Sequence, residues 1–337
     1  MSAPPRRNGA ATSTGDSPPA REPTHKIRWT TADIPDQTGK VVLVSGANSG
    51  LGYETALALA GKGAQVLLAC RDVAKGREAE ARIRETHPDA STVVIRLDLA
   101  SLDDVRRAAD ELHATTTRLD VLVNNAGVMA LPYRRTHDGF EMQLGTNHLG
   151  PFALTGQLLD LLLATPKARI VTVSSGFHRL AQIRFDDPHW TRGYSKWAAY
   201  GQSKVANLLF AYELQRRLAA ARFDAISVAA HPGYAATNLQ FAGPRMEGSS
   251  IVEHVSALGN RLFAQSAAMG ALPQLYAATA ADVRGGDYFG PRGIGELWGS
   301  PRKVASNAHS NDPVVAARLW AWSEQATRTT YAALASS

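Results

Sequence analysis

Short runs of β-branched and leucine residues alternate with longer helical patterns along most of this chain. The six clearest runs cover residues 41–44, 65–68, 92–95, 121–123, 169–173 and 225–228. Nearly continuous apolar strands separated by helices indicate a parallel sheet covered on both faces. The alternation therefore predicts an α/β, doubly wound fold with helices on both faces of the sheet. A run at 287–289 would bring the sheet to about seven strands, and a last helix is expected after Pro313.

The chain divides into a polar start and one long domain. Residues 1–24 are rich in Pro, Ser, Thr, Gly and Ala, so they cannot bury enough apolar surface to offset chain entropy and are expected to be disordered. We expect residues 25–337 to form a single domain. Two stretches interrupt its rhythm, near 176–196 and 234–265, and both follow strands, where ligands bind in this class of fold. We interpret them as substrate-loop insertions.

Composition excludes several kinds of function. The net charge is +6, but the arginines are spread along helical patterns and no basic run is interleaved with aromatics, so no nucleic-acid partner is expected. No stretch reaches the ~18 apolar residues of a membrane span, and no secretory signal is recognisable. With a single cysteine, Cys70, no intramolecular disulfide can form. We expect a cytoplasmic protein without a metal site.

A glycine-rich loop follows the first predicted strand. Its glycines are Gly46, Gly50 and Gly52, with Asn48, Ser49 and Leu51 between them. Glycines here permit a tight turn and a close approach of the backbone to a pyrophosphate, which then lies at a helix N-terminus. The alternative is a plain glycine-rich turn. The position directly after the first strand favours a Rossmann-type dinucleotide site.

The end of the second predicted strand indicates which dinucleotide is bound. An acidic residue there would bond the ribose 2′-OH of NAD, whereas arginine accommodates the 2′-phosphate of NADP. The chain has Cys70 and then Arg71, which favours NADP(H), although the next residue, Asp72, can pair with the arginine or permit NAD use. Asp98 and Leu99 follow the third strand. Asn125, Ala126 and Gly127 follow the fourth, where they can pack against the nucleotide or serve as ordinary turn residues.

The candidate reacting groups lie in the second half of the chain. Tyr200 and Lys204 are four residues apart at the start of a helical pattern, so they share one helix face. A nearby ammonium group favours the phenolate and brings a tyrosine closer to acid–base work at neutral pH. Ser175 ends the fifth strand, and Asn147 lies in the helix before that strand. Capping or a helix-kink hydrogen bond is the alternative role for the last two.

Together these motifs resemble the short-chain dehydrogenase/reductase family. The glycine loop, Asn-Asn-Ala-Gly, Asn147, the strand-end Ser-Ser, the Tyr/Lys pair and a later His-Pro-Gly occur in that family's order, over roughly residues 38–290. The segment 146–152 and the Ala-Cys-Arg-Asp run further resemble the retinol dehydrogenase-like branch, which generally uses NADP(H).

The resemblance implies a role for each residue. Tyr200 would be the general acid in reduction and the base in oxidation, and Lys204 would lower its pKa and hold the nicotinamide ribose. Ser175, as the second serine of its pair, would hydrogen-bond the substrate oxygen. Asn147 would hold a water in a proton relay behind Lys204. Thr237 would contact the nicotinamide carboxamide. The expected cofactor-binding residues are Gly46, Asn48, Ser49, Gly50, Leu51, Gly52, Arg71, Asp98, Leu99, Asn125, Ala126, Gly127, Tyr200, Lys204, Pro232, Gly233 and Thr237.

The spacing between Ser175 and Tyr200 departs from the family. They are 25 residues apart, which the resemblance leads us to regard as long. The insertion should wall the pocket without moving the tyrosine, and Phe177, Trp190 and Trp197 favour an apolar substrate unless they simply pack the insertion. The sequence thus predicts a carbonyl/alcohol oxidoreductase acting on a small molecule. A protochlorophyllide reductase-like C=C reductase and a catalytically idle NADP-binding regulator are the alternatives. The resemblance leaves a homodimer or a homotetramer open.

Overall fold

One eight-stranded sheet organises the molecule. The computed structural model describes residues 1, 28–234 and 265–334. The strand order is β3-β2-β1-β4-β5-β6-β7-β8; the first seven strands are parallel, and β8 pairs antiparallel with β7. The order reverses between β1 and β4, so the predicted doubly wound α/β fold is confirmed.

The elements follow the predicted alternation. The strands are β1 (Val41–Ser45), β2 (Gln65–Cys70), β3 (Thr92–Arg96), β4 (Val121–Asn124), β5 (Arg169–Val173), β6 (Ile226–Ala230), β7 (Tyr288–Pro291) and β8 (Pro301–Lys303). The α-helices are α1 (Gly50–Ala60), α2 (Val73–Thr86), α3 (Leu102–Thr115), α4 (Met142–Leu144), α5 (Gly150–Gln157), α6 (Leu159–Ala164), α7 (Lys196–Ala220), α10 (Ala267–Thr279) and α11 (Pro313–Thr327). The shorter turns are η1 (Thr31–Asp33), the π-helical η2 (Gly145–Leu149), η3 (Gly176–Leu180), η4 (Ile294–Glu296), η5 (His309–Asn311) and η6 (Ala332–Leu334).

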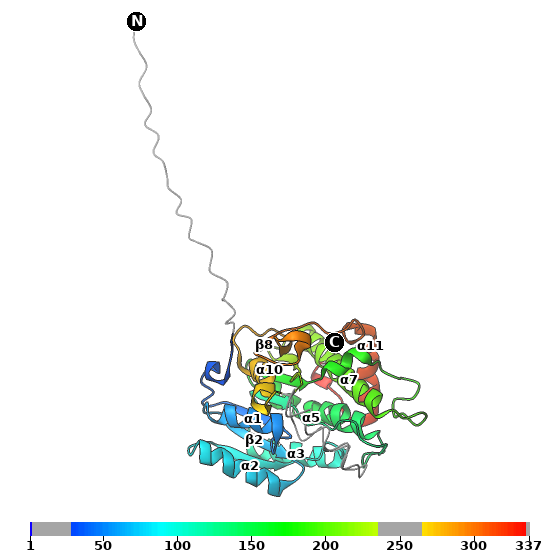
Figure 1. Cartoon of the computed structure of the whole chain (residues 1–337), viewed down its shortest axis with the longest axis horizontal. Helices are drawn as coiled ribbons and strands as arrows, with labels where there is room; N and C mark the ends of the chain where they lie inside the picture. The colour runs from blue at the N-terminus through cyan, green and yellow to red at the C-terminus, as the bar shows by residue number, and fades with distance from the viewer. Residues whose placement is uncertain (2–27, 235–264, 335–337) are drawn as a thin grey trace.

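The sheet has a packed helical layer on each face. Along β1, Val42 and Val44 pack in one cluster with α1, α2 and α10, whereas Val41 and Leu43 pack in another with α3, α5 and α7. This alternation is the period-2 geometry of a strand buried on both faces. Figure 1 shows α1 and α10 side by side on one face, while α11 lies against α7 in a further layer.

Most predicted elements lie within one or two residues of their expected positions. The runs at 287–289 and after Pro313 are β7 and α11. The sequence did not predict β8, because it has only three residues, two of which are exposed and basic.

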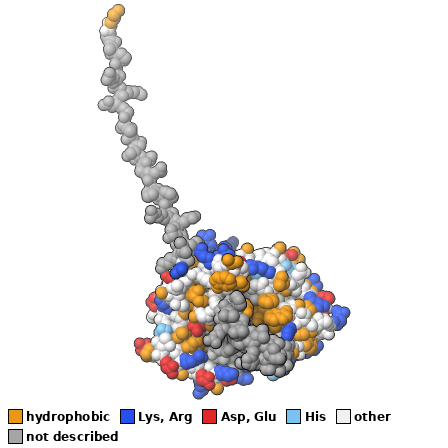
Figure 2. Space-filling view, viewed as in Figure 1, with side chains coloured by type: hydrophobic (Ala, Val, Ile, Leu, Met, Phe, Trp, Pro, Cys, Tyr) orange, Lys and Arg blue, Asp and Glu red, His pale blue; other side chains and the backbone are white. Residues whose placement is uncertain are grey.

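Two predictions fall largely outside the described residues. These are the disordered start at 1–24 and the insertion near 234–265, which includes Thr237. No helix in the described ranges has the length and apolar character needed to cross a membrane. Charged side chains of both signs are interspersed around the rim of the face in Figure 2, as expected of solvated helix faces.

Candidate active site

The glycine-rich loop connects β1 to α1 at the point where the strand order reverses. Gly46 and Gly50 have φ values of +72° and +55°, in the left-handed region that favours glycine. A Cβ on Gly52 would overlap the carbonyl oxygen of Gly46 and lie 2.6 Å from Asn125 Nδ2. Ser49 caps α1 without a side-chain hydrogen bond. The first N–H groups of α1 are therefore available to an anion.

Asn125 holds this loop in place. Its Nδ2 donates to Ser45 O at 2.8 Å, and its Oδ1 accepts from Gln274 Nε2 at 3.2 Å. The Ser45 hydroxyl oxygen accepts from the backbone N–H groups of both Asn125 and Ala126 at 3.0 Å. Asn125 thus joins the ends of β1 and β4. Sequence reasoning missed Gln274, whose only signal is an amide within the apolar pattern of α10.

Tyr200 and Lys204 lie in the first turns of α7 and are both almost fully buried. The Ser175 side chain lies close enough to the Tyr200 hydroxyl to lower its pKa, so the long insertion does not displace the tyrosine from Ser175. Lys204 Nζ donates to Val173 O at 3.1 Å and lies 5.8 Å from the centre of the Tyr200 ring. These contacts bring three of the predicted reacting groups together.

Burial dominates the proton affinities of both groups. It raises the pKa of Tyr200 to about 12, against the opposing effect of Ser175. It lowers the pKa of Lys204 to about 8. In the protein alone, burial is the largest influence on the tyrosine pKa, and the expected electrostatic effect of Lys204 stays a prediction.

The two serines after β5 have different environments. Ser174 is buried, and its hydroxyl donates to Lys204 O at 2.8 Å, within the fold. Ser175 is partly exposed and faces Tyr200, and its oxygen also accepts from Phe177 N at 3.4 Å as the cap of η3. The capping role considered from the sequence is present, in addition to the contact with Tyr200.

Asn147 lies in the π-helical turn η2 and bonds to its surroundings on both sides. Its Oδ1 accepts from Val128 N at 2.7 Å, and its Nδ2 donates to Val128 O at 2.9 Å and Ser203 Oγ at 2.8 Å. A Cβ on Gly127 would lie 3.0 Å from Asn147 Oδ1 and 3.5 Å from Lys204 Nζ. A side chain at Gly127 would therefore crowd the Asn147 amide beside the Lys204 ammonium group.

The glycine loop, Tyr200 and Lys204 share one pocket of about 200 Å³. The predicted residues that line it are Gly46, Asn48, Ser49, Gly50, Leu51, Gly52, Asn125, Ala126, Gly127, Tyr200, Lys204 and Pro232. The predicted residues outside this lining are Arg71, Asp98, Leu99, Asn147, Ser175 and Gly233; Ser174, the other serine of the pair, is within it. Asp98 accepts from Ala100 N at 3.0 Å, and Leu99 is buried.

Arg71 is exposed directly after β2, and no side-chain partner for it occurs among the residues that the structure describes. Asp72, the partner considered from the sequence, instead caps α2 through Lys75 N at 3.2 Å and pairs with Lys75 Nζ at 3.8 Å. Cys70 is buried, and burial raises the pKa of its thiol to about 11. Within the described part of the chain, the strand end therefore presents a guanidinium group without a side-chain partner, and it has no carboxylate at the position of the cysteine.

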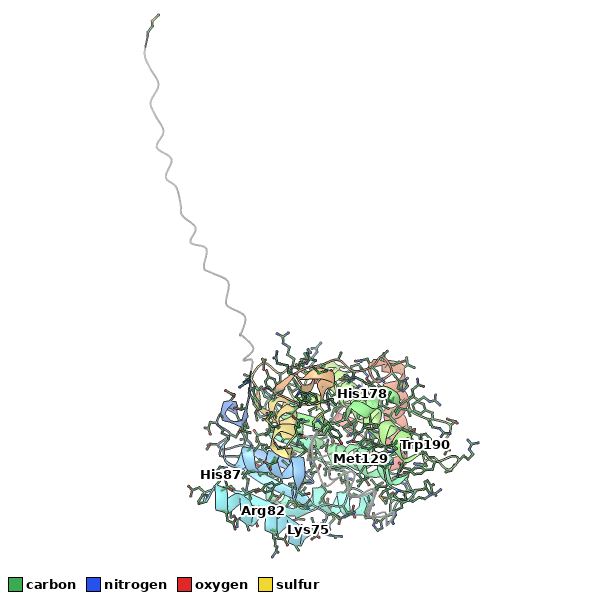
Figure 3. All side chains as sticks on the ribbon, in the orientation of Figure 1. Lys75, Arg82, His87, Met129, His178 and Trp190 are labelled. Atoms are coloured by element: carbon green, nitrogen blue, oxygen red, sulfur yellow. The ribbon has the colours of Figure 1, made fainter. Side chains whose placement is uncertain are left out.

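The aromatic residues of the first insertion separate into two kinds. Phe177 and Trp197 are 38% and 46% exposed and stack with ring centres 5.2 Å apart, and Phe177 meets the Tyr200 ring edge-on at 5.6 Å. Trp190 packs under Arg184 at 4.3 Å within the insertion. Figure 3 shows Trp190 on the α7 side of the molecule, away from Lys75 and Arg82 of α2. The stacked pair forms an exposed aromatic ledge beside the tyrosine.

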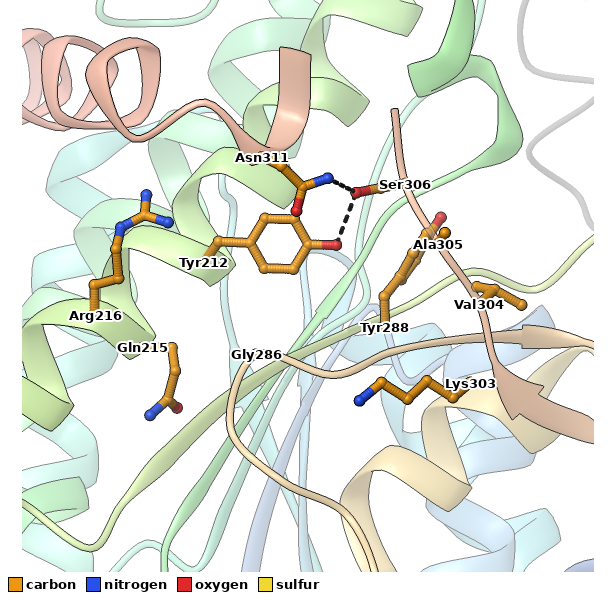
Figure 4. Close-up of a pocket in the computed structure, with 10 residues that line it drawn as sticks. All are labelled: Tyr212, Gln215, Arg216, Gly286, Tyr288, Lys303, Val304, Ala305, Ser306 and Asn311. Atoms are coloured by element: carbon orange, nitrogen blue, oxygen red, sulfur yellow. Dashed lines mark hydrogen bonds between the residues drawn. The ribbon is translucent and has the colours of Figure 1, made fainter. Parts of the chain in front are cut away.

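A second pocket, of about 350 Å³, lies between α7 and the β7–β8 hairpin (Figure 4). Its cationic groups and the Tyr212 and Ser306 hydroxyls are already bonded, whereas the buried Tyr288 hydroxyl has no hydrogen-bond partner among the described residues. Ser306 Oγ contacts Tyr212 OH at 3.0 Å and accepts from Asn311 at 2.8 Å, and Arg216 pairs with Glu213 at 2.8 Å. Because the second pocket does not contain the Tyr200–Lys204 pair, the chemistry is assigned to the smaller one.

Comparison with known proteins agrees with this geometry. The family model described as short chain dehydrogenase matches residues 40–247. The chain belongs to the short-chain dehydrogenase family. The members of this family are oxidoreductases that act on carbonyl/alcohol pairs with NAD(P). The predicted family and the coarse activity are therefore confirmed.

Relatives and solved structures extend along most of the chain. Retinol dehydrogenase 14 of Mus musculus is 41% identical over 298 residues, 85% of each chain, and retinol dehydrogenase 13 of Homo sapiens is 42% identical over 289 residues, 84% of this chain and 83% of that one. A solved structure of a putative uncharacterized protein from Mycobacterium Paratuberculosis has a TM-score of 0.74 at 42% identity, covering 90% of this chain and 99% of that one. The chain is therefore retinol dehydrogenase-like.

Proposed function

We propose that this chain is an NADP(H)-dependent oxidoreductase that interconverts a carbonyl and an alcohol on an apolar substrate, with Tyr200 as the general acid and base. The observation that carries the proposal is the shared pocket. Tyr200 and Lys204 line it together with the Gly46–Gly52 loop, whose backbone can receive a phosphate, and Ser175 lies beside Tyr200.

The residues present fit a dinucleotide. The Gly46–Gly52 loop has no Cβ where the backbone turns most tightly, and the free N–H groups of α1 point to a pyrophosphate site. When bound, the nicotinamide supplies or accepts the hydride. Arg71, unpaired among the described residues, would pair with a ribose 2′-phosphate, which is the basis for proposing NADP(H) over NAD(H). A structural neighbour, a putative NAD(P)-dependent gluconate 5-dehydrogenase from Beutenbergia cavernae at 26% identity and a TM-score of 0.58, has NADP bound at low occupancy.

Tyr200 and Ser175 would act on the substrate oxygen. Because burial keeps the Tyr200 hydroxyl protonated at neutral pH, it is suited to donate a proton to a carbonyl oxygen during reduction. Ser175 would hold the same oxygen. Lys204 would stabilise the phenolate that remains, since its ammonium group lies on the same helix face. Asn147, whose side chain bonds to Val128 and Ser203, would hold a water in a proton relay behind Lys204.

The aromatic ledge supports an apolar substrate. Phe177 and Trp197 expose stacked rings beside Tyr200, and an apolar molecule would remove those rings from water on binding. The names of the relatives, retinol dehydrogenases, fit the same class of substrate.

Oxidation of NADPH against a panel of aldehydes, ketones and enones, retinaldehyde included, tests the proposal. Removing a positioned acid typically costs about 100- to 10,000-fold in rate, so Tyr200→Phe should lose kcat by that factor while retaining NADPH binding and the fold. Turnover of enones alone would favour a C=C reductase, and NADPH binding without any turnover would favour a regulator. Either result would contradict the proposal.

Tyr194→Phe is the matched control. Tyr194 also lies near the start of α7, but its hydroxyl donates to Leu131 O at 2.8 Å and accepts from Gln143 at 3.0 Å. Its loss should therefore reduce stability by about 1 kcal/mol and leave kcat nearly unchanged. If Tyr194→Phe abolished turnover and Tyr200→Phe did not, the acid would be misassigned.

A further inference from the structure

Three loops around the pocket meet at one carboxylate. Glu296, in η4, accepts from Arg179 of η3 at 2.7 Å and from His231, which follows β6, at 3.0 Å. Both bonds reach the same oxygen, Oε2. The Glu296 side chain is only 13% exposed and His231 only 2%, whereas Arg179 is 40% exposed, so the carboxylate and the imidazole are shielded from water and the guanidinium group reaches the surface. Such charge-assisted hydrogen bonds are stronger than neutral ones.

The backbone at Glu296 is held in an unfavourable conformation. Its φ is +58°, in the left-handed region, and the preceding Gly295 has a φ of +63°. Left-handed backbone at a non-glycine residue persists where its surroundings hold it, and such residues cluster at functional sites. The loop is also fitted closely to its neighbours, because a Cβ on Gly290 would overlap the His231 ring and a Cβ on Gly233 would overlap the carbonyl oxygens of the η4 loop.

His231 connects the carboxylate to the turn that borders the pocket. Its Nδ1 accepts from Gly233 N at 3.2 Å, so the ring proton lies on Nε2, which donates to Glu296. Pro232, between them, lines the pocket. On the other side, Arg179 belongs to the 3₁₀ turn that Ser175 caps.

We propose that Glu296 is a positioning residue that couples the Ser175 turn to the Pro232–Gly233 turn, so that the serine and the floor of the pocket keep one relative arrangement. The Arg179–Glu296 hydrogen bond holds the Ser175 turn on the substrate side of the pocket. The His231–Glu296 hydrogen bond holds the Pro232–Gly233 turn on the side where the nicotinamide would lie. This assignment of the two sides rests on the proposed function. The coupling itself rests on the contacts.

Steady-state kinetics and direct NADPH titration of the full chain distinguish the effects of the two hydrogen bonds to Glu296. Glu296→Gln weakens both bonds, and we expect kcat/KM for the carbonyl substrate to fall about tenfold and NADPH affinity to fall by several-fold. Arg179→Met should raise the substrate KM and leave NADPH affinity unchanged. Arg179→Lys, which keeps the positive charge, should recover most of the loss.

Glu111→Gln is the matched control, because Glu111 pairs with an arginine at 3.0 Å on α3, away from these loops. Glu111→Gln should change neither kcat/KM for the carbonyl substrate nor the affinity for NADPH. Equal losses of substrate and cofactor binding in Arg179→Met, or no change in Glu296→Gln with an unchanged melting temperature, would overturn the proposal.

Hydrogen exchange provides a readout that needs no turnover. In Glu296→Gln, peptides covering 176–180 and 231–234 should exchange faster together, whereas Arg179→Met should affect only the first. If the wild type reduced no carbonyl, the proposed function would fail while the exchange data could still support the coupling. If exchange in both peptides were unchanged in Glu296→Gln, the coupling would be wrong whatever the activity.

Discussion

Lys204 carries an ammonium group into a site from which most water is excluded. Its pKa is lowered from 10.5 to about 8, so between these values the unfolded chain binds more protons than the folded one. The free energy of unfolding therefore rises with pH across this interval, and below pH 8 the full cost of burying the charge is present. The position lowers stability, as functional groups in active sites often do.

We therefore predict that Lys204→Met stabilises the fold while abolishing turnover. The gain should be about 3 kcal/mol at pH 7 and about 1 kcal/mol at pH 9.5, because one pKa unit corresponds to ~1.4 kcal/mol. Val173 O keeps a donor, Asn207 Nδ2, at 3.0 Å. Urea denaturation at both pH values measures the difference in the free energy of unfolding between the variant and the wild type. Lys303→Met, at an exposed lysine, is the control. A variant less stable than the wild type at pH 7 would contradict this.

Arg71 should discriminate between the two nicotinamide dinucleotides. Arg71→Ala removes a guanidinium group with no partner among the described residues, so it should weaken NADPH binding about tenfold or more and barely affect NADH, which has no 2′-phosphate. Fluorescence titration of both cofactors measures the ratio. Lys62→Ala, beyond the far end of α1, should alter neither affinity. Equal losses of affinity for NADPH and NADH in Arg71→Ala, or tighter binding of NADH than of NADPH by the wild type, would contradict the role of Arg71 in selecting NADPH.

Single residues were predictable where a motif constrains them and unpredictable where tertiary contacts assign the role. The pairing of Tyr200 with Lys204 follows from helical spacing. The sequence alone could not place Gln274 on Asn125, or Glu296 between Arg179 and His231, because their partners are far apart in the chain. Trp190 illustrates the converse, since an aromatic residue in the insertion proved to pack under Arg184.

At the scale of elements, the β1–α1 connection depends on glycine at position 52. In Gly52→Ala the new methyl group would overlap Gly46 O and press on Asn125 Nδ2, so the loop must open. We predict at least a tenfold loss of NADPH affinity with an unchanged circular dichroism spectrum, since the sheet does not depend on this contact. Gly176→Ala is the control, because a Cβ there meets nothing within 4 Å among the described residues. If Gly52→Ala bound NADPH with wild-type affinity, the assignment of this loop to the cofactor site would be wrong.

The central strands β1, β2 and β4 were predicted well because each is buried on both faces and forms a mostly apolar run. Val41–Ser45 and Arg169–Val173 begin at the expected residues. The π-helical turn at Asn147 and the 3₁₀ turn after Ser175 had no such signal, since their form depends on side-chain bonds to Val128 and Phe177. Periodicity predicts where chain segments lie within layers, and it does not predict the local turns that aim functional groups.

For the whole molecule, α7 connects the site to the outer layer. Near its start it carries Tyr200 and Lys204, while Leu209 packs with α11, Leu208 with Tyr288, and Phe210 with the central core. A helix buried on every side lacks an amphipathic stripe, which is why its sequence shows no clear polar face. The third layer formed by α11 therefore stabilises the helix that presents the reacting groups.

Trp320 of α11 tests this dependence. It is 2% exposed, its ring centre lies 5.2 Å from that of Phe152 and 4.5 Å from that of Tyr331, and Arg217 covers it at 4.4 Å. Replacing a buried tryptophan by alanine typically costs about 3–5 kcal/mol, and we predict a loss in that range for Trp320→Ala.

The rings that Trp320 packs against belong to Phe152, Phe210 and Tyr331, none of which lines the pocket, so NADPH affinity at low temperature should be retained in the fraction that stays folded. Chemical denaturation and cofactor titration of the same preparation measure both quantities. Val314→Ala, at a position on the same helix that is 75% exposed, should change stability by no more than about 0.5 kcal/mol. A loss below about 1 kcal/mol in Trp320→Ala would mean that α11 is dispensable to the layer beneath it, and that α7 is held by the sheet alone.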